Sequence, residues 1–343
     1  MSSGNREDGR ALAVFLANFN HGHYLPQALD ALCAQSVQPG RIWLVDDAST
    51  DNSRAVIEDY RQRYPELLHV TLLDCNQGFL ANATKWLKTV ESEFVLFAAA
   101  DDAIYPDLFR KSLALLRQFP QAGLCSALSR QMDEHGNDLG LFHTPIPRKS
   151  PGYISPSEAR RLLIYDDGWF MGNTVIYRTE ALRKIGFDPS LGSFSDGFVC
   201  RAVALQHGAC FIPENLGYWR RLPNSLSQEA LNNPNIARNI IDRSTALMSD
   251  SFTHLFPKEY IRRLRGRSIF WSICAYLNLP RQQARQNTRE LLRSSSWFDK
   301  TLLTEMAVLP IGLRWIGKFG LFLWLRPYDL VIVARRALRR IRD

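Results

Sequence analysis

Residues 11–46 read ALAVFLANFNHGHYLPQALDALCAQSVQPGRIWLVD, and this stretch decides the fold. An apolar run at 11–19 and a β-rich run at 41–46 flank a segment at 24–35 whose apolar residues recur at helical spacing. Strand, helix and strand in this order form a βαβ unit, in which the two strands lie parallel in one sheet. The stretch therefore predicts an α/β fold.

The same alternation continues to about residue 130. Further strand-like runs lie at 69–74, 94–99 and 122–128. Helix-like segments alternate with them at 50–64, 79–90 and 106–119. We expect a mainly parallel sheet flanked by helices on both faces. A stretch at 140–160 is rich in Pro, Ser and Gly, and strand and helix patterns then resume up to about residue 221.

From about residue 235 the pattern is helical to the end of the chain. The sequence therefore predicts three parts: a polar tail at 1–10, an α/β domain at 11–235 and a basic, amphipathic helical region at 236–343. Within the α/β domain we expect two halves, at 11–130 and 131–235.

Composition indicates an ordinary folded protein, with 46% hydrophobic and 22% charged residues in a chain of 343. The 6 cysteines are scattered and form no CxxC pair, which favours a reduced, cytosolic chain. The first ten residues are polar and contain no apolar core of the signal-peptide type, so nothing indicates export.

Positive charge is concentrated in the last quarter of the chain. The net charge of the chain is +8, and the part from Lys258 onward contains 18 Lys and Arg but only 6 Asp and Glu. A basic surface of this kind meets nucleic acid, anionic lipid or a phosphorylated acceptor. No recognition motif for nucleic acid accompanies it, so we expect no nucleic-acid partner.

The longest apolar stretch, 306–325, is interrupted by Arg314 and Lys318, which lie four residues apart and hence on one helical face. A membrane-spanning helix needs about 20 mostly uncharged residues, so the stretch suits an amphipathic helix on an anionic bilayer better. Trp315 and Trp324 would then lie at the interface. The final segment, DLVIVARRALRRIRD, repeats the pattern. Packing of both segments on their own protein, with the basic residues in solvent, is the equal alternative.

Polar side chains follow four of the predicted strands: Asn18-Phe19-Asn20, Asp46-Asp47, Asn76 and Asp101-Asp102. Ligands bind outside the carboxyl ends of the strands in such sheets, so these residues are expected at one binding edge. Each alone also suits a turn or a helix cap. The adjacent carboxylates of Asp101 and Asp102 repel one another and need a cation, a basic partner or solvent.

Common nucleotide motifs are absent from the sequence. No GxGxxG follows the first strand, which argues against a dinucleotide site of the Rossmann type, and no GxxxxGK[ST] occurs, which excludes a P-loop. His21 and His23 form a pair without a carboxylate at ligand spacing, so we interpret them as loop residues.

Five segments together resemble the family 2 glycosyltransferases, which have the nucleotide-sugar-binding GT-A fold. They are LANFNHGHYLPQALDALCAQS, LVDDASTDNS, NQGFLANAT, FAAADDAIYPD and IGFDPSLGSFSDGFVCRAVALQHGACFIPE. LVDDASTDNS is similar to the family's VDDGSTD element, and FAAADDAIYPD is similar to its metal-binding DxD region. The resemblance runs from Leu12 to Ser227, with all segments in order.

The resemblance implies a site for a nucleotide-diphosphate sugar, with 11–130 as the nucleotide-sugar-binding half of the domain and 131–235 as the acceptor half. Phe19 would stack on the base, Asp47 would accept a hydrogen bond from it, and Asp46 would support that loop. The implied donor-binding residues are Ala17, Phe19, Asn20, Asp46, Asp47, Asn76, Gly78, Asp101, Arg220 and Arg221. Asp101 and Asp102 would hold Mn²⁺ or Mg²⁺, and Asp196 would be the general base of an inverting transfer. Trp169 and Ser195 are weaker candidates for the acceptor.

Three residues depart from the family pattern. Ala99 replaces the first Asp of Asp-x-Asp, Ser195 stands where the family usually has Glu, and Leu222 occupies the position of a His. These departures imply a thinner metal shell, in which Arg220 or Arg221 takes part of the phosphate charge.

The implied activity is transfer of a sugar, expected from a UDP-sugar, to a saccharide or lipid-linked acceptor in bacterial surface polysaccharide or glycolipid biosynthesis. Such an enzyme works in the cytoplasm, peripherally at the inner face of the cytoplasmic membrane. The alternatives are a nucleotidyltransferase and a non-catalytic nucleotide-sugar-binding or scaffolding subunit. The first should carry an early glycine-rich basic loop, which NFNHGHYL does not supply.

Overall fold

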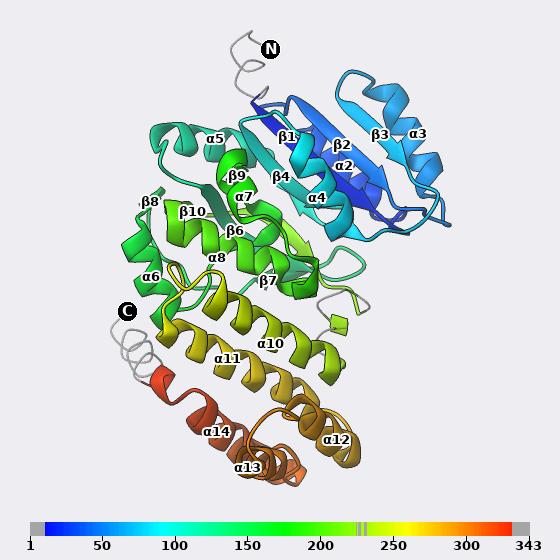
Figure 1. Cartoon of the computed structure of the whole chain (residues 1–343). Coiled ribbons are helices and arrows are strands. Elements are labelled where there is room, and N and C mark those ends of the chain that lie inside the picture. The colour runs from blue at the N-terminus through cyan, green and yellow to red at the C-terminus, as the bar shows by residue number, and fades with distance from the viewer. Residues whose placement is uncertain (1–10, 224, 226–227, 230–231, 331–343) are drawn as a thin grey trace. The chain divides into compact units, whose positions relative to one another are not determined.

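The computed structural model describes residues 11–330 with the exception of 224, 226, 227, 230 and 231. The chain divides into two compact units (Figure 1). The first unit consists of Met1–Ala159, Gly168–Pro189 and Ser195–Leu222, and the second of Arg160–Asp167, Ser190–Phe194 and Pro223–Asp343.

One mixed sheet organises the first unit. Its order is β3-β2-β1-β4-β9-β6-β10-β5, with β7 paired to β6 and β8 paired to β10. The strands of the described residues are β1 (Leu12–Asn18), β2 (Arg41–Asp46), β3 (Leu68–Leu72), β4 (Phe94–Ala99), β5 (Ala103–Ile104), β6 (Leu124–Met132), β7 (Asp138–Leu141), β8 (Gly152–Ile154), β9 (Ile176–Arg178) and β10 (Ala209–Arg220). Strands β1 to β4 run parallel, as do β6 and β10, whereas β9 is antiparallel to β4 and β6. The predicted mainly parallel sheet is confirmed.

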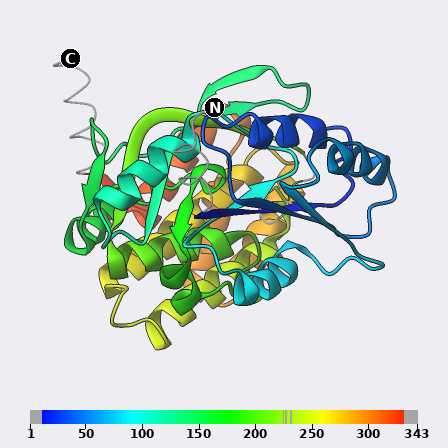
Figure 2. The ribbon, with the colours of Figure 1, turned by 90° about the horizontal axis from the view of Figure 1, so that it is seen from above.

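Helices cover both faces of the parallel strands. Figure 2 shows α2 and α3 on one face and α4 on the other. The helices of this half of the chain are α2 (Leu25–Cys33), α3 (Ser53–Arg63), α4 (Phe79–Thr89), α5 (Leu108–Gln118), α6 (Pro156–Tyr165), η1 (Gly172–Thr174), α7 (Thr179–Ile185), η2 (Pro189–Phe194) and α8 (Ser195–His207). Every residue of β1 except Ala17 is buried, as expected for a strand that is covered on both faces.

The main core cluster of the first unit lies between the sheet and α2, α3 and α5. On α5 the buried apolar residues Leu108, Phe109, Leu113 and Leu116 recur at helical spacing. They join Leu12, Leu16 and Leu96 of the central strands in one cluster. Full burial of each such side chain stabilises the fold by about 1.5–3 kcal/mol. This core therefore holds the strand ends in fixed positions.

The second unit is helical where it is described. Its elements are α10 (Pro234–Asp250), α11 (Lys258–Tyr276), α12 (Arg281–Leu291), α13 (Trp297–Ala307), η3 (Ile311–Leu313), α14 (Arg314–Leu325) and η4 (Pro327–Asp329). It has its own core, which includes Phe270, Ile273, Leu303 and Leu321. The predicted helical C-terminal region is confirmed for these residues. The final predicted segment, 331–343, lies outside the described residues, and none of the described helices is long and apolar enough to cross a membrane.

A buried ion cluster fastens the last described turn to α11. The Asp329 carboxylate is 2% exposed and accepts hydrogen bonds of 3.0 Å from both Nε and Nη2 of Arg267 and of 2.8 Å from Nε of Arg326. Burial opposes ionisation of Asp329, but these guanidinium groups outweigh it and hold its pKa below the usual value.

Candidate functional site

The predicted strand-end residues gather at one edge of the sheet. Asn18 at the end of β1 pairs with Asp46 at the end of β2, and Ala17 pairs with Ala99 at the end of β4. Because three neighbouring parallel strands end in register, the loops that follow them share one edge. This part of the sequence prediction is borne out by the pairing of the strands.

Asp46 is the centre of a buried network at this edge. Its Oδ1 accepts from Asn18 Nδ2 at 2.8 Å and from Ser49 Oγ at 2.5 Å, and its Oδ2 accepts from the Ser49 backbone N–H at 3.1 Å. The side chain is fully buried. Ala48 between them has φ of 65°, a left-handed conformation that closes the turn. Asp46 therefore holds the loop after β2 in place rather than facing a ligand.

Asp47 ties that loop to the start of α4. Its two carboxylate oxygens accept from the backbone N–H groups of Gln77 at 2.8 Å and Gly78 at 2.7 Å. Asn76 Oδ1 also accepts from Gly78 N–H, at 3.0 Å. Gly78 has φ of +83°, which favours glycine at this position. Each carboxylate oxygen has a second lone pair, so the predicted contact of Asp47 with a base stays compatible with this geometry.

Phe19 is the exposed aromatic residue of the edge. Its side chain is 43% exposed directly after β1. The next residue, Asn20, has φ of 54° and is fixed by bonds to Ser49 and Thr50: its N–H donates to Ser49 Oγ at 2.9 Å, and its Oδ1 accepts from Thr50 N–H at 2.8 Å. The anchored neighbour leaves the Phe19 ring open to a planar ligand.

Asp101 and Asp102 form the turn between β4 and β5. Asp102 is 8% exposed, and its Oδ1 accepts from the backbone N–H of Arg220 at 2.8 Å. Burial, and next the negative charge of Asp101, raise the pKa of Asp102 well above its usual value. His21 Nδ1 lies 4.0 Å from Asp101 Oδ1. Our interpretation of His21 as an ordinary loop residue missed this contact, because only the fold brings residues 80 positions apart together.

The carboxylate pair fits a hard divalent cation. The described residues contain no group of three or more His, Cys, Asp and Glu side chains that could hold a metal ion. A pair of carboxylates is nevertheless what Mg²⁺ or Mn²⁺ uses when substrate phosphates and water complete its shell. The negative charge of Asp101 disfavours ionisation of Asp102, and a cation bound between them would reduce this repulsion.

Arg220 faces the protein and not solvent, which corrects the expectation that it meets the diphosphate directly. It is 3% exposed, and its guanidinium lies 4.5 Å from the ring centre of Tyr24. Its Nε donates to the Asp101 carbonyl at 2.8 Å, its Nη1 to the Asp133 carbonyl at 2.9 Å, and its Nη2 to Gln27 Oε1. These acceptors occupy the donors that a phosphate would need. The neighbouring Arg221 is exposed.

Asp196 lies in the first turn of α8. The residue is exposed, and its Oδ1 accepts from Gly197 N–H at 2.6 Å. The protein packed around it raises the pKa of Asp196 above the usual value, which brings a general base nearer to its working range. A Cβ atom on Gly172 would lie 2.9 Å from Asp196 Oδ2, so the glycine leaves space for the carboxylate. Ser195 is buried, and its Oγ accepts from Asp188 N–H at 3.2 Å.

The short helix η1 links Asp196 to the carboxylate turn. Gly172 of η1 packs against Asp196, and η1 also contacts β4 and β5, which flank Asp101 and Asp102. Asn173 Nδ2 lies 3.0 Å from the position of a Cβ on Gly217, the partner of Ile104 in β5. A continuous set of contacts therefore runs from the base candidate to the pair that fits a metal.

Trp169 is buried, which corrects the weaker expectation that it contacts the acceptor. Its side chain is 0% exposed and packs against Phe170, with ring centres 4.4 Å apart. An indole without a free face cannot stack on an acceptor. The sequence pattern DDGWFMGN does not distinguish a buried tryptophan from an exposed one.

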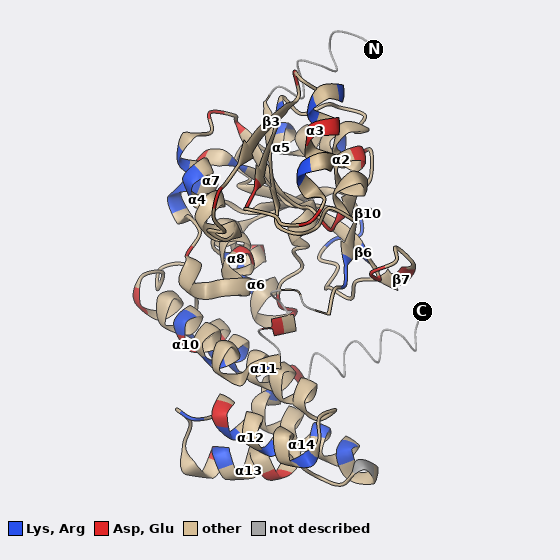
Figure 3. Cartoon of the chain, turned by 90° about the vertical axis from the view of Figure 1, so that its right-hand side faces the viewer, with Lys and Arg blue, Asp and Glu red and all other residues tan. Residues whose placement is uncertain are grey.

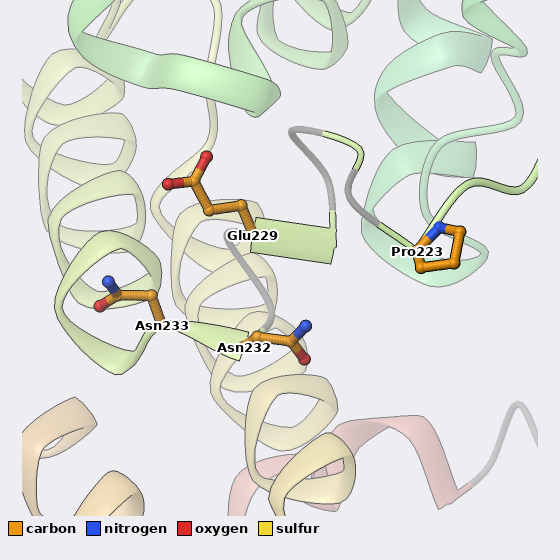
Figure 4. A pocket seen from close by; sticks show the side chains of 4 residues that line it. All are labelled: Pro223, Glu229, Asn232 and Asn233. Atoms are coloured by element: carbon orange, nitrogen blue, oxygen red, sulfur yellow. The ribbon is translucent and has the colours of Figure 1, made fainter.

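Two pockets lie away from these residues. One, of about 380 Å³, belongs to the second unit, and Figure 4 shows its lining residues Pro223, Glu229, Asn232 and Asn233. Another, of about 410 Å³, lies where β6 and β10 begin and includes Arg178, Lys184 and His207. The residues named for either pocket include none of the predicted site residues.

Comparison with known proteins identifies the family. The model of the family described as "Glycosyl transferase family 2" matches residues 13–186, which is half of the chain. The chain therefore belongs to glycosyl transferase family 2, and the resemblance drawn from the five segments is confirmed. An uncharacterised glycosyltransferase of Nostoc sp. is 26% identical over 213 residues, which cover 61% of this chain and 64% of that protein. The chain thus spans less than two thirds of that relative's length.

Solved structures share the fold. The crystal structure of residues 1–349 of Staphylococcus aureus TarS in complex with UDP-GlcNAc matches with a TM-score of 0.61 at 16% identity, covering 95% of this chain and 91% of that one. The mannosyltransferase PcManGT of Pyrobaculum calidifontis, in complex with GDP-Man and Mn²⁺, matches with a TM-score of 0.56 at 15% identity, covering 93% and 87%. The expected GT-A fold is confirmed.

Proposed function

We propose that the chain is an inverting glycosyltransferase that moves a sugar from a UDP-sugar to an acceptor hydroxyl. The observation that carries the proposal is the carboxylate pair Asp101–Asp102 at the edge where β1, β2 and β4 end in register. The range 11–235 would be the transferase domain and 236–343 its helical extension. The nucleotide sugars bound by TarS and PcManGT support a donor of this class.

The donor's base would lie against Phe19, with Asp47 accepting its N–H. Asn18, Asp46 and Ser49 hold this loop in one conformation before the donor arrives, which lowers the entropic cost of binding. Ala17 and Asn20 line the same loop, and Asn76 and Gly78 close it from the α4 side.

Asp101 and Asp102 would hold the divalent cation together with the donor's diphosphate. When it is bound, the cation neutralises the charge that develops on the leaving diphosphate. The exposed Arg221 is free to add positive charge, and Arg220 fixes the turn that carries both carboxylates. Ala99 and Leu222 leave this shell thinner than the family pattern.

Asp196 would take the proton of the acceptor hydroxyl as its oxygen attacks the anomeric carbon. A new carbon–oxygen bond forms on one face while the bond to the diphosphate breaks on the other, and the diphosphate leaves with the electron pair. Displacement in one step inverts the anomeric centre. The raised pKa of Asp196 suits this role because a base accepts a proton best when its pKa approaches the working pH.

The acceptor would be a saccharide or a lipid-linked saccharide of a bacterial surface polymer. Its support is the name of two relatives, the poly(ribitol-phosphate) β-N-acetylglucosaminyltransferase TarS and the putative teichuronic acid biosynthesis glycosyltransferase TuaG of Bacillus subtilis. Ser195 is buried, so its part in acceptor binding would be to shape the loop before Asp196. The six free cysteines agree with the cytoplasm as the place of action.

Thermal unfolding with nucleotides and nucleotide sugars tests the donor. UDP and one UDP-sugar, with Mn²⁺, should raise the melting temperature, because a ligand that binds only the native state stabilises it by mass action. Stabilisation by GDP alone would exclude the uridine donor. Stabilisation by no nucleotide would contradict the proposal.

Asp196→Asn tests the chemistry separately. The variant should bind the donor as the wild type does and lose turnover by roughly 10²–10⁴-fold, the usual contribution of a general base. Equal turnover in variant and wild type would exclude Asp196 as the base. No turnover in either, together with intact UDP-sugar binding, would identify a binding subunit.

A further inference from the structure

Helix α14 exposes the side chains that a surface helix normally buries. Within it, Gly317 and Leu321 are the buried residues. Its large apolar side chains are open to solvent, and their exposed fractions are 69% for Trp315, 43% for Ile316, 56% for Phe319 and 39% for Leu323. A helix of a folded domain usually turns its apolar stripe to the core and its polar residues to water.

Glycines explain why the bulky residues point outward. A Cβ on Gly317 would lie 2.3 Å from the Met306 carbonyl oxygen of α13, and one on Gly320 would lie 3.1 Å from the Met306 side chain. On α11, a Cβ on Gly266 would lie 2.2 Å from the Leu325 carbonyl oxygen. Backbone contact on the glycine side fixes the rotation of α14. The outward face is therefore part of the packed structure.

Exposed apolar side chains lie on both α13 and α14 of the second unit. Trp315, Phe319 and Leu323 follow one another at four-residue spacing and hence share a helix face. The start of α13 adds Trp297, which is 79% exposed, and Phe298, which is 56% exposed and lies 5.7 Å from the ring of Trp324. We call this surface the apolar strip; it consists of Trp297, Phe298, Trp315, Ile316, Phe319 and Leu323.

Basic residues accompany the apolar strip. Lys318 is exposed on α14, and Arg314 begins the same helix. Figure 3 shows basic residues on α14 and residues of both charges on α13, which contains Lys300 together with Asp299 and Glu305. From Lys258 onward the chain carries 18 basic and 6 acidic residues. Tryptophan favours the membrane interface, and lysine and arginine bind anionic headgroups, so the two features complement one kind of surface.

We propose that the apolar strip docks the chain on an anionic lipid bilayer, with α14 lying along the interface and its aromatic side chains among the headgroups. A second copy of the chain is a poorer occupant. A second copy would bring the same positive charges of Arg314 and Lys318 to the contact, whereas an anionic bilayer would bring opposite charges. The proposal rests on the geometry of these helices and requires nothing of the transfer chemistry.

Co-sedimentation of the full chain with vesicles tests the proposal. The wild type should bind vesicles of equimolar phosphatidylcholine and phosphatidylglycerol and bind phosphatidylcholine alone much more weakly. Trp315→Ser with Phe319→Ser should lower the partition coefficient about tenfold or more. The matched control is Leu139→Ser with Leu141→Ser on β7, where side chains of 49% and 44% exposure lie outside the apolar strip.

Three results would overturn the proposal. The first is that the wild type does not bind the anionic vesicles. The second is that the control variant and the strip variant lose vesicle binding equally. The third is that sedimentation velocity finds a dimer that depends on the apolar strip, without vesicle binding. Equal melting temperatures of all variants would establish that they fold. All variants should bind the UDP-sugar equally. A failure of membrane docking can therefore be distinguished from a failure of the proposed transferase function.

Discussion

Replacing Arg220 by methionine tests whether this buried cation fastens the carboxylate turn. Methionine keeps an unbranched apolar stem and removes the donors to the carbonyls of Asp101 and Asp133 and to Gln27. A hydrogen bond from a charged donor contributes about 1.5–3 kcal/mol, and water reaches a site of 3% exposure poorly. Allowing for some relaxation, we expect Arg220→Met to lower the free energy of unfolding by about 4 kcal/mol.

Arg221→Met is the matched control, because the adjacent arginine is exposed. Its removal should change stability by less than about 0.5 kcal/mol. If Arg221 meets the diphosphate, the variant should still bind UDP less tightly, by about tenfold at low salt. Urea unfolding measures the first quantity, and calorimetric titration with UDP and Mn²⁺ measures the second.

The two arginines should therefore separate stability from affinity. Arg220→Met should lower both, because the turn that carries Asp101 and Asp102 loses its anchor. Arg221→Met should lower affinity alone. Equal stability of the two variants would refute the reasoning, since it would mean that the buried contacts of Arg220 contribute nothing to the fold.

Three further changes are expected to have distinct effects. Gly172→Ala should lower turnover about tenfold with donor binding intact, because its methyl group lies 2.9 Å from Asp196 Oδ2; unchanged turnover would contradict this. Mn²⁺ should strengthen donor binding about tenfold less in His21→Ala than in the wild type. His23 is exposed, and His23→Ala should leave the effect of Mn²⁺ unchanged. Asp329→Asn should cost about 3 kcal/mol of unfolding free energy at pH 7. Because folding lowers the pKa of Asp329, this difference should begin to shrink as the pH falls below about 3.9, the unfolded value, and should be lost as the pH falls through the lower pKa of the folded state; a pH-independent difference would exclude ionisation as its source.

Local periodicity predicted the elements of the first unit well. The expected strands at 41–46 and 94–99 match β2 and β4 residue for residue, and the expected helix at 79–90 exceeds α4 by one residue. These segments are regular because burial on one or both faces imposes a period of two or 3.6 residues on the sequence. The expectation that their ends meet at one edge followed from the parallel order alone.

Contacts between distant segments were not predictable in this way. The insertion of the antiparallel β9 between β4 and β6 joins segments about 80 and 50 residues apart, and no local pattern records it. The same holds for His21 beside Asp101 and for Arg220 beneath the turn. Trp169 shows the limit for single residues, because a tryptophan suits a buried site and a sugar platform equally.

The position of Arg220 changes the meaning of the thin metal shell. One guanidinium group connects the turn of Asp101, the hairpin at Asp133 and Gln27 of α2. Arg220 thus fixes the turn that carries the carboxylate pair, and its guanidinium group is not available to a phosphate. With Leu222 in place of a histidine, the charge of the proposed diphosphate would be balanced by the proposed cation and by Arg221. A donor complex built this way should depend on the cation more strongly than one with an arginine in direct phosphate contact, because fewer fixed charges remain when the cation is removed.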